Sequence, residues 1–522
     1  MMKSKQPKAL TWLLIIFFLF SVVIPLGRML AYLFETDVVS VVSSGRFMTG
    51  LVNSLTTSLT ATLISVILAA VLAWSLERLQ VKGKAVFAFL FIVPMLIPSI
   101  SHGTGLVILL GRNGIITNLL HLDFSIYGFW GIVLGSVMYS FPVAFLMLSD
   151  ILRYEDSTPY EAASVLGIPK RKQFQSIFVP FIRKPLISII FAVFTLIITD
   201  YGVPLMVGGQ CTTLPVVMYQ DVIGMLDFGK GSVIGVVLLV PAFIAFVLDS
   251  MNRDHASLNF TPRQFEKKKS PVGMVACIIA SILILLPIAA FLVISLVKKY
   301  PIDMTLTWFN VMKTFQQHAG RYLLNSLLIS LIVSAVGVTA AFASAYLSVR
   351  TNVKQARILH LLSIISLSIP GIVLGLSYVL LFKGTFLSGT FAIIILANLM
   401  HFFSSPYLMM YNTLGKINPN LEDVGETLGL GRTAIIRDVI IPQSFGTILE
   451  MAVYFFVNSM MTISAVSFLS TYRTQPLALM IPMFEGQMQI ECIGVVSLII
   501  LIINVLLKLL ISTVSTKKRR DF

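Results

Sequence analysis

Long runs of apolar residues alternate with short polar segments along almost the whole chain. Twelve of these runs approach or exceed about 20 residues, the length that a helix needs to cross the hydrocarbon core of a bilayer. Their approximate limits are 10–33, 51–74, 85–110, 127–150, 185–207, 231–249, 271–297, 322–347, 357–382, 390–411, 444–468 and 490–514. The pattern predicts an all-α integral membrane protein with about twelve transmembrane helices.

The first run follows Lys3, Lys5 and Lys8, which gives it the charged start of a secretory signal. It is longer than the apolar part of a signal peptide, and no small-x-small cleavage site follows it. We therefore expect a retained span.

Composition and charge agree with a chain that lies in a bilayer. Only 12% of the residues are charged, against about 25% in soluble domains. If the N-terminus is inside, 28 of the 38 Lys and Arg residues fall in inside segments, as expected for cytoplasmic loops. We therefore expect both termini to be cytoplasmic. The formal net charge of +15 then needs no nucleic acid partner.

The second half of the chain repeats landmarks of the first half. Asn53-Ser54-Leu55 recurs 272 residues later as Asn325-Ser326-Leu327, and Ile97-Pro98 recurs at the same offset as Ile369-Pro370. Each copy holds an even number of spans, so we expect two parallel six-helix repeats related by an axis along the membrane normal. The expected divisions are 1–50 (first span and outer loop), 51–250 (first transmembrane domain), 251–270 (cytoplasmic linker), 271–320 (seventh span and outer loop), 321–514 (second transmembrane domain) and 515–522 (basic tail).

The longest inside loop of each repeat lies between its fourth and fifth spans, and the first copy carries helix signals. We expect Thr158 to be an N-cap, with Glu161 completing a capping box three residues later. Pro159 suits the first helical position, and Gly167 permits a left-handed stop. The segment predicts a short helix, followed by a second helix that begins near Lys170.

The corresponding loop of the second copy follows the same logic 262 residues later. Asn420 is the expected cap, Asp423 lies three residues on, Gly429 is the expected stop and Pro442 is the expected end marker. A helix of about two turns is unstable by itself in water. Two such helices, each capped and stopped, predict a docking surface for a partner. We expect Ala162 and Ala163, or Val424 and Gly425 in the second copy, to keep one side of each helix thin enough for the partner to approach closely.

The two loops resemble the cytoplasmic signature of the permease subunits of type I ATP-binding-cassette (ABC) importers. That signature is Glu-Ala-Ala, three residues, Gly, nine residues and then Ile-x-Leu-Pro. The first loop matches it at Glu161, Ala162, Ala163, Gly167, Ile177 and Pro180. The second loop keeps the spacing but changes most letters, and its positions are taken by Asp423, Gly425, Gly429 and Pro442.

The resemblance implies a place in the cytoplasmic membrane of a prokaryote and separate roles for several subunits. The loops would bind two copies of a cytoplasmic ATPase, which would bind ATP and Mg²⁺, and an extracytoplasmic solute-binding protein would deliver the solute. The sequence agrees, because none of its Gly-Lys pairs is followed by the Ser or Thr of a phosphate-binding loop. The six histidines are scattered. We expect no metal site, no cofactor and no catalytic residue in this chain, and therefore a transport subunit that is not an enzyme.

Polar residues in the fifth and eleventh spans mark the candidate wall of the translocation pathway. They are Asp200, Tyr201, Asn458, Ser459, Thr462 and Ser464. Ionisable groups at membrane depth are costly and usually functional. The alternative is that the small polar residues only pack helices together. Glu450, near the inner end of the eleventh span, either pairs with a basic residue of the neighbouring loop or acts in gating.

Two runs of sequence bear on the solute. Residues 199–209, TDYGVPLMVGG, and residues 455–470 resemble the fused permeases of 2-aminoethylphosphonate importers. Fused permeases for ferric iron and thiamine share the duplicated architecture and are the alternatives. A twelve-span secondary transporter is a further alternative. It would need a relay of intramembrane carboxylates, and only Asp200 and Glu450 qualify. The favoured function is ABC-type import of a small polar solute, with 2-aminoethylphosphonate first.

Overall fold

A computed structural model describes residues 8–121, 123, 125–252, 263–351, 354–418 and 420–520. Among these residues the only strands are β1 (Val297–Lys299) and β2 (Asp303–Leu306), which form a small antiparallel hairpin. Ten helices of the described chain are long and apolar enough to cross a membrane, and two bent helix pairs raise the number to as many as twelve. The prediction of an all-α membrane protein is confirmed.

The helices run in the order that the apolar pattern predicts. The first half contains α1 (Lys8–Phe18), α2 (Ile24–Ala31), α3 (Val38–Ser43), α4 (Gly45–Arg78), α5 (Lys84–Ile92), α6 (Ser99–Leu110), α7 (Ile115–Leu120), α8 (Phe129–Arg153), α9 (Thr158–Val165), α10 (Lys170–Gln173), α11 (Val179–Ile198), α12 (Gly202–Val207), α13 (Leu214–Met225) and α14 (Phe228–Asn252). The second half contains α15 (Pro271–Leu296), α16 (Phe309–Gln316), α17 (Ala319–Arg350), α18 (Ala356–Ile365), α19 (Gly371–Phe382), α20 (Phe391–Phe402), α21 (Ser404–Lys416), α22 (Asn420–Thr427), α23 (Arg432–Ile435), α24 (Ile441–Met461), α25 (Met480–Gly486) and α26 (Ile490–Arg520).

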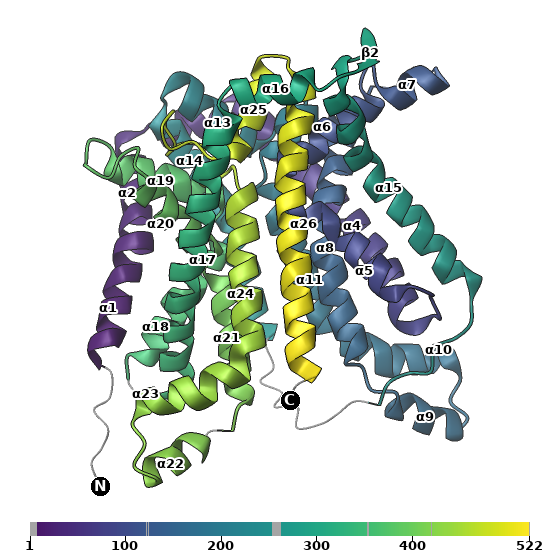
Figure 1. Ribbon diagram of the computed structural model, residues 1–522, viewed down its shortest axis with the longest axis vertical. Helices are drawn as coiled ribbons and strands as arrows, with labels where there is room; N and C mark the ends of the chain where they lie inside the picture. Colours follow the sequence, from purple (N-terminus) through teal and green to yellow (C-terminus); the bar gives the residue numbers. More distant parts are fainter. Residues whose placement is uncertain are drawn as a thin grey trace.

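The two repeats point the same way. In Figure 1, α9 and α22, the short helices predicted in the two loops, lie at the lower end of the molecule, where α1 also begins and α26 ends. The helices α13 and α25 and the hairpin lie at the upper end. This placement agrees with a parallel duplication. Residues 253–262 of the predicted linker and the end of the predicted basic tail, 521–522, lie outside the described residues, and 515–520 continue α26.

The third apolar run of each repeat is broken, although we expected one continuous span. In the first repeat the run divides at Ile97-Pro98 into α5, extended by a 3-10 turn, and α6. In the second repeat it divides at Ile369-Pro370, and the two parts meet at 109°. The residue before a proline avoids the helical conformation, and Ile97 and Ile369 are accordingly extended. The tenth run is also bent, by 50° between α20 and α21.

The fifth and eleventh spans differ from the predicted 185–207 and 444–468. Continuous helices run over Lys170–Ile198 and Arg432–Met461, so each span begins in the loop and ends earlier than expected. After Ile198 the chain turns into the separate short helix α12. The pathway residues predicted in the last turns of these spans therefore lie at helix ends and in the segments that follow.

Pro180 and Pro442 lie inside these continuous helices. A π-helical turn, Phe174–Phe178 or Ile436–Ile440, comes directly before the turn that contains each proline. In a regular α-helix the proline ring would clash with the carbonyl four residues earlier, and a π turn changes the hydrogen-bond register at that point. The expectation that Pro442 marks a helix end is wrong, because the helix continues to Met461.

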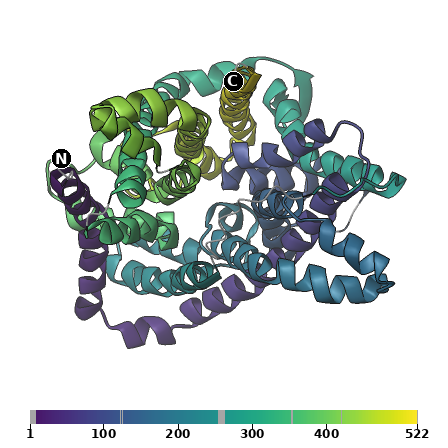
Figure 2. The same ribbon diagram turned by 90° about the horizontal axis from the view of Figure 1, so that it is seen from below.

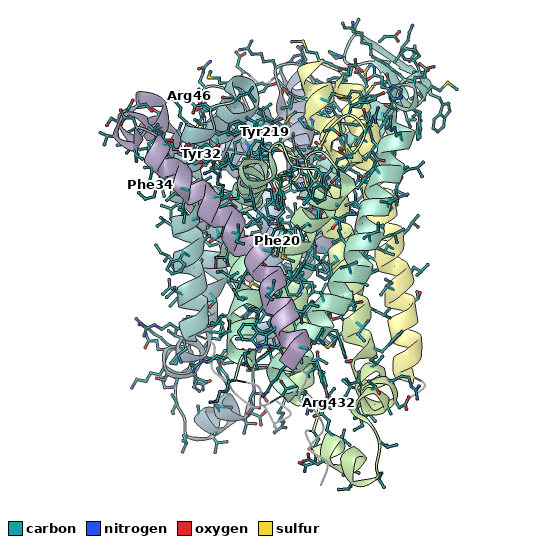
Figure 3. The ribbon with its side chains drawn as sticks, turned by 90° about the vertical axis from the view of Figure 1, so that its left-hand side faces the viewer. Phe20, Tyr32, Phe34, Arg46, Tyr219 and Arg432 are labelled. Carbon is teal, nitrogen blue, oxygen red and sulfur yellow. The ribbon has the colours of Figure 1, made fainter. Side chains whose placement is uncertain are left out.

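The first and seventh spans each pack against the opposite half of the chain. Phe18 of α1 contacts Phe403 with ring centroids 4.9 Å apart, and the Tyr378 hydroxyl donates a hydrogen bond to the Ser21 carbonyl at 2.6 Å. Figure 3 shows α1 and the π-helical turn Leu19–Val23, which contains Phe20, crossing this side of the molecule. Figure 2, seen from below, places the start of α1 beside the green helices of the second repeat. The seventh span, α15, likewise packs against α4, α5 and α6 of the first repeat.

The last span of each repeat crosses to the broken third span of the other repeat. α14 packs against α19, and α26 reaches the break in the first repeat. There Asn504 Nδ2 donates to the Leu96 carbonyl at 2.9 Å, and the hydroxyls of Ser101 and Ser497 lie 2.9 Å apart. The two proline breaks therefore lie at the interface between the repeats.

Candidate functional site

The short helices α9 and α22, predicted to dock on an ATPase, are called the candidate coupling helices. The first of them, α9, begins at Thr158, the residue that we predicted as its cap. Ser157 is the N-cap residue, and the Ser157 hydroxyl donates to Glu161 Oε1 at 2.9 Å. Thr158 is already helical, and its N–H and hydroxyl both donate to Asp156 Oδ1, at 3.2 and 2.9 Å. The predicted capping box from Thr158 to Glu161 is wrong by one residue, because Asp156 provides a nearer acceptor for Thr158.

The second candidate coupling helix, α22, also starts with its predicted cap. Asn420 is the first helical residue, and its N–H donates to Asn418 Oδ1 at 3.0 Å. Both helices therefore exist where the sequence predicts them, but each depends on a side chain further upstream. The sequence did contain a signal for these acceptors, because Asp156 and Asn418 are polar residues two positions before the predicted caps.

Both helices end at the predicted glycine. The φ angles are +69° at Gly167 and +74° at Gly429, in the left-handed region that glycine enters without steric cost. In each copy the N–H of the residue after the glycine donates to the carbonyl five positions earlier, at 2.9 Å. This is the long hydrogen bond of a Schellman motif. The predicted stop is confirmed in both copies.

The small residues of the two helices face in two directions. Ala163 is 6% exposed, and Gly425 is also buried. A Cβ on Gly425 would lie 2.6 Å from Ile435 Cδ1, so the glycine permits α22 to pack closely on α23. Ala162 is exposed. The expectation that Ala163 and Gly425 leave room for a partner is wrong, because both residues are buried and Gly425 packs on α23 of its own loop.

The outer sides of α9 and α22 are rich in exposed apolar residues. Val165 and Leu166 are 88% and 76% exposed, and Val424 and Leu428 are 53% and 72% exposed. Glu161 and Asp423 are exposed on the same helices. Exposed apolar surface that is rimmed by polar residues is typical of interaction sites. Of the remaining signature residues, Ile177 is half-buried and Pro180 and Pro442 are exposed.

A buried ion pair joins α9 to the end of α4. Arg78 forms a hydrogen-bonded ion pair with Glu155, and their side chains are only 10% and 4% exposed. The Tyr160 hydroxyl of α9 donates to the same carboxylate. Burial and this hydrogen bond raise the pKa of Tyr160 above its usual range, so the hydroxyl stays a donor. Sequence reasoning missed Arg78, Glu155 and Tyr160, because only the fold brings them together.

The second repeat attaches α22 differently. The Tyr346 hydroxyl donates to Glu422 Oε1 at 3.0 Å. Arg350, the counterpart of Arg78 at the repeat offset, donates to the backbone carbonyls of Leu414 and Ile417 at 2.7 and 2.5 Å. Arg432, at the start of α23, lies at this lower end of the molecule (Figure 3). Backbone acceptors thus take the place of the buried carboxylate.

Asp200 lies in the turn between α11 and α12. Its Oδ1 accepts a hydrogen bond from the Ser99 hydroxyl at 2.6 Å, and its Oδ2 accepts one from the Val203 N–H at 2.9 Å. The carboxylate therefore joins the start of α12 to the start of α6, directly after the proline break. Ser99 was missed in the sequence, where no pattern linked it to Asp200.

The second repeat contains the same junction without the carboxylate. Thr462 takes the place of Asp200 and forms the C-cap of α24, where it is buried. Gly371 takes the place of Ser99 and closely contacts Ser464. In the first repeat Gly202, the counterpart of Ser464, closely contacts Ser99. Each junction therefore pairs one serine with one glycine, in opposite order.

Polar residues of the two repeats meet next to these junctions. The Tyr201 hydroxyl lies 2.6 Å from Ser467 Oγ, and the Tyr201 ring stacks on Tyr219 at 4.7 Å. The structure thus brings the predicted residues Asp200 and Tyr201 to the interface between the repeats.

Among the described residues, no side-chain hydrogen bond joins Asn458 or Ser459 to the other repeat. Asn458 Nδ2 donates to the Tyr454 carbonyl of its own helix at 2.7 Å, and Ser459 is buried. Glu450 is exposed in the middle of α24. Within the described part of the chain, Glu450 forms no ion pair.

The sequence matches the family model of the binding-protein-dependent transport system inner membrane component twice, over residues 61–253 and 337–520. The ferric transport system permease protein FbpB of Actinobacillus pleuropneumoniae is 25% identical over 84% of this chain and 66% of its own length. A protein assigned to ferric transport in Haemophilus influenzae is 24% identical over 86% of this chain and 73% of its own length. The thiamine transport system permease protein ThiP of Brucella abortus is 26% identical over 41% of this chain and 42% of its own length.

The two matches cover more than half of the chain and coincide with the two repeats. The relatives are transport components, so the chain is a transport subunit of the inner membrane. It belongs to the family of binding-protein-dependent transport system inner membrane components, as a fused permease of a type I ABC importer that carries both copies in one chain.

Proposed function

We propose that α9 and α22 are the sites at which two copies of a cytoplasmic ATPase bind this permease, and that their movement opens a path for a small polar solute. One observation carries the proposal. Two short helices at the same end of the molecule share one stop geometry and both expose apolar residues, although their sequences differ. The lower end in Figure 1 is then the cytoplasmic side.

The solute would pass between the repeats, where Asp200 and Tyr201 meet residues of the second half. An extracytoplasmic binding protein would deliver it at the upper end. Ferric iron is the first candidate, because FbpB of Actinobacillus pleuropneumoniae and the Haemophilus influenzae protein assigned to ferric transport each match more than four-fifths of the chain. Thiamine is the second, on the shorter match to ThiP. 2-Aminoethylphosphonate rests on sequence resemblance alone and comes third.

Solute uptake by cells that express the chain with its ATPase and binding protein tests both the coupling role of α9 and the identity of the solute. We expect uptake of radiolabelled ferric iron, and measure thiamine and 2-aminoethylphosphonate in parallel. Glu161→Lys and Gly167→Asp should each abolish uptake while the protein stays in the membrane. The control is Asp303→Lys, a charge reversal in the hairpin at the opposite end. Normal uptake in both α9 variants would refute the coupling role. Uptake of another solute in place of ferric iron would refute iron as the solute.

A further inference from the structure

A segment of the linker between the repeats, residues 263–268, lies across the lower end of the first repeat. At one end the Ser157 N–H donates to the Arg263 carbonyl at 2.9 Å, and the Arg263 N–H donates to Asp156 Oδ1 at 3.1 Å. At the other end the Lys268 N–H donates to the Arg78 carbonyl at 3.1 Å. This linker segment is therefore bound by its backbone to the start of α9 and to the end of α4.

Between these two ends the Phe265 side chain completes a closed group. Its ring lies 3.9 Å from the Arg78 guanidinium carbon, and it meets the Tyr160 ring edge-on at 5.1 Å. Arg78 and Tyr160 both bind Glu155. Each member thus contacts two others, and the four side chains come from α4, from the loop after α8, from α9 and from the linker segment.

Two further side chains of the linker segment bind the first repeat. Arg263 forms an ion pair with Glu161 at 2.6 Å, with both side chains well exposed. Lys267 Nζ donates to the Leu76 carbonyl at 3.0 Å. The exposed ion pair contributes little by itself. The partly buried aromatic and cation–π contacts of Phe265 carry more of the attachment.

The second repeat has no counterpart of this arrangement in the described part of the chain, where α22 forms hydrogen bonds only with residues of its own repeat. The linker segment also leads directly into α15, which begins at Pro271. α15 packs against α4, α5, α6 and α26. A displacement of α9 can therefore be transmitted to α4 through Arg78. It can also be transmitted to α15 through the linker segment.

We propose that Phe265 and Arg263 are positioning residues of the first coupling site, which bind α9 to α4 and to the seventh span so that the three move as one unit. The proposal rests on the proposed function only for the source of the movement. The attachment itself is a property of this chain alone, and it distinguishes α9 from α22.

Hydrogen exchange of the full chain in lipid nanodiscs tests the attachment without any ATPase. Phe265→Ala should accelerate exchange of the α9 amides about tenfold, because it removes an aromatic pair and a cation–π contact. Arg263→Ala should accelerate it about twofold. Phe265→Trp should preserve protection, and Phe265→Leu should give an intermediate rate if the alanine variant does not fold. Exchange of α22 is the internal control.

Phe386→Ala is the matched control, since Phe386 is 88% exposed in the loop before α20, and it should leave α9 unchanged. Unaltered α9 exchange in Phe265→Ala, or equal acceleration in α22, would overturn the proposal. In the assembled transporter, Phe265→Ala should lower the amount of solute imported per ATP hydrolysed, with ATPase binding preserved. An unchanged ratio would overturn the transmission step. Failure of the wild-type chain to bind any ATPase would instead refute the proposed function.

Discussion

The two candidate coupling helices have the same local form and different surroundings. α9 and α22 are each eight residues long and end in the same left-handed glycine turn. α9 is joined to α4 through a buried ion pair and to the linker segment, whereas α22 is joined to α17 by the hydrogen bond from Tyr346 to Glu422 and to α23 by one close contact. A turn depends on one residue and its φ angle, so it survives duplication. Attachments depend on several side chains from distant segments, so they diverge more readily.

The largest difference is expected at the buried ion pair. Glu155→Gln leaves Arg78 buried without a compensating charge, which should cost about 3–5 kcal/mol in the free energy of unfolding. The corresponding change in the second repeat, Glu422→Gln, weakens one hydrogen bond from Tyr346 and should cost about 1 kcal/mol. Detergent-induced unfolding of the two variants measures both values. Equal costs would show that the two attachments are equivalent.

A change specific to α22 is expected at its contact with α23. Gly425→Ala places a Cβ 2.6 Å from Ile435 Cδ1, and overpacking of this kind should cost about 1–3 kcal/mol. Ile435→Val in the same chain should recover part of the loss, because it removes the methyl group at the contact. Exchange of the α22 amides reports the effect. The α9 amides, next to Ala163 at the equivalent position, should exchange at an unchanged rate in this variant. That result would show that the close contact is specific to α22.

The smallest effects should be the same in both helices. Gly167→Ala and Gly429→Ala force a Cβ into the left-handed region, at about 1–2 kcal/mol each, and should unwind the last turn of α9 and α22 by similar amounts. Hydrogen exchange at the two helix ends measures this. Gly415→Ala, at a helical position with open space around it, is the control and should be nearly neutral. A large difference between the two glycine variants would mean that the shared turn is not equally important.

Elements with a local cause could be predicted from the sequence. The apolar runs predicted the membrane spans, and the glycines predicted the stops of α9 and α22. The caps were missed, because a polar side chain just outside each predicted helix accepts the hydrogen bond of the first helical N–H. The starts of the fifth and eleventh spans were missed because a π turn lets each helix run from the loop through Pro180 or Pro442. Such a turn has no clear signature in the residue pattern.

The sequence by itself determined that this chain lies in a bilayer, that it is duplicated, and that each copy carries a short stopped helix. Apolar length, repeat spacing and glycine turns are properties of neighbouring residues, and neighbouring residues can be read along the chain. Only the tertiary structure decided that α1 packs on the second repeat and α15 on the first, and that Ser99 binds Asp200 and Phe265 contacts Arg78. These contacts join residues from about 100 to nearly 400 positions apart, and they depend on how helices cross and on where each one breaks.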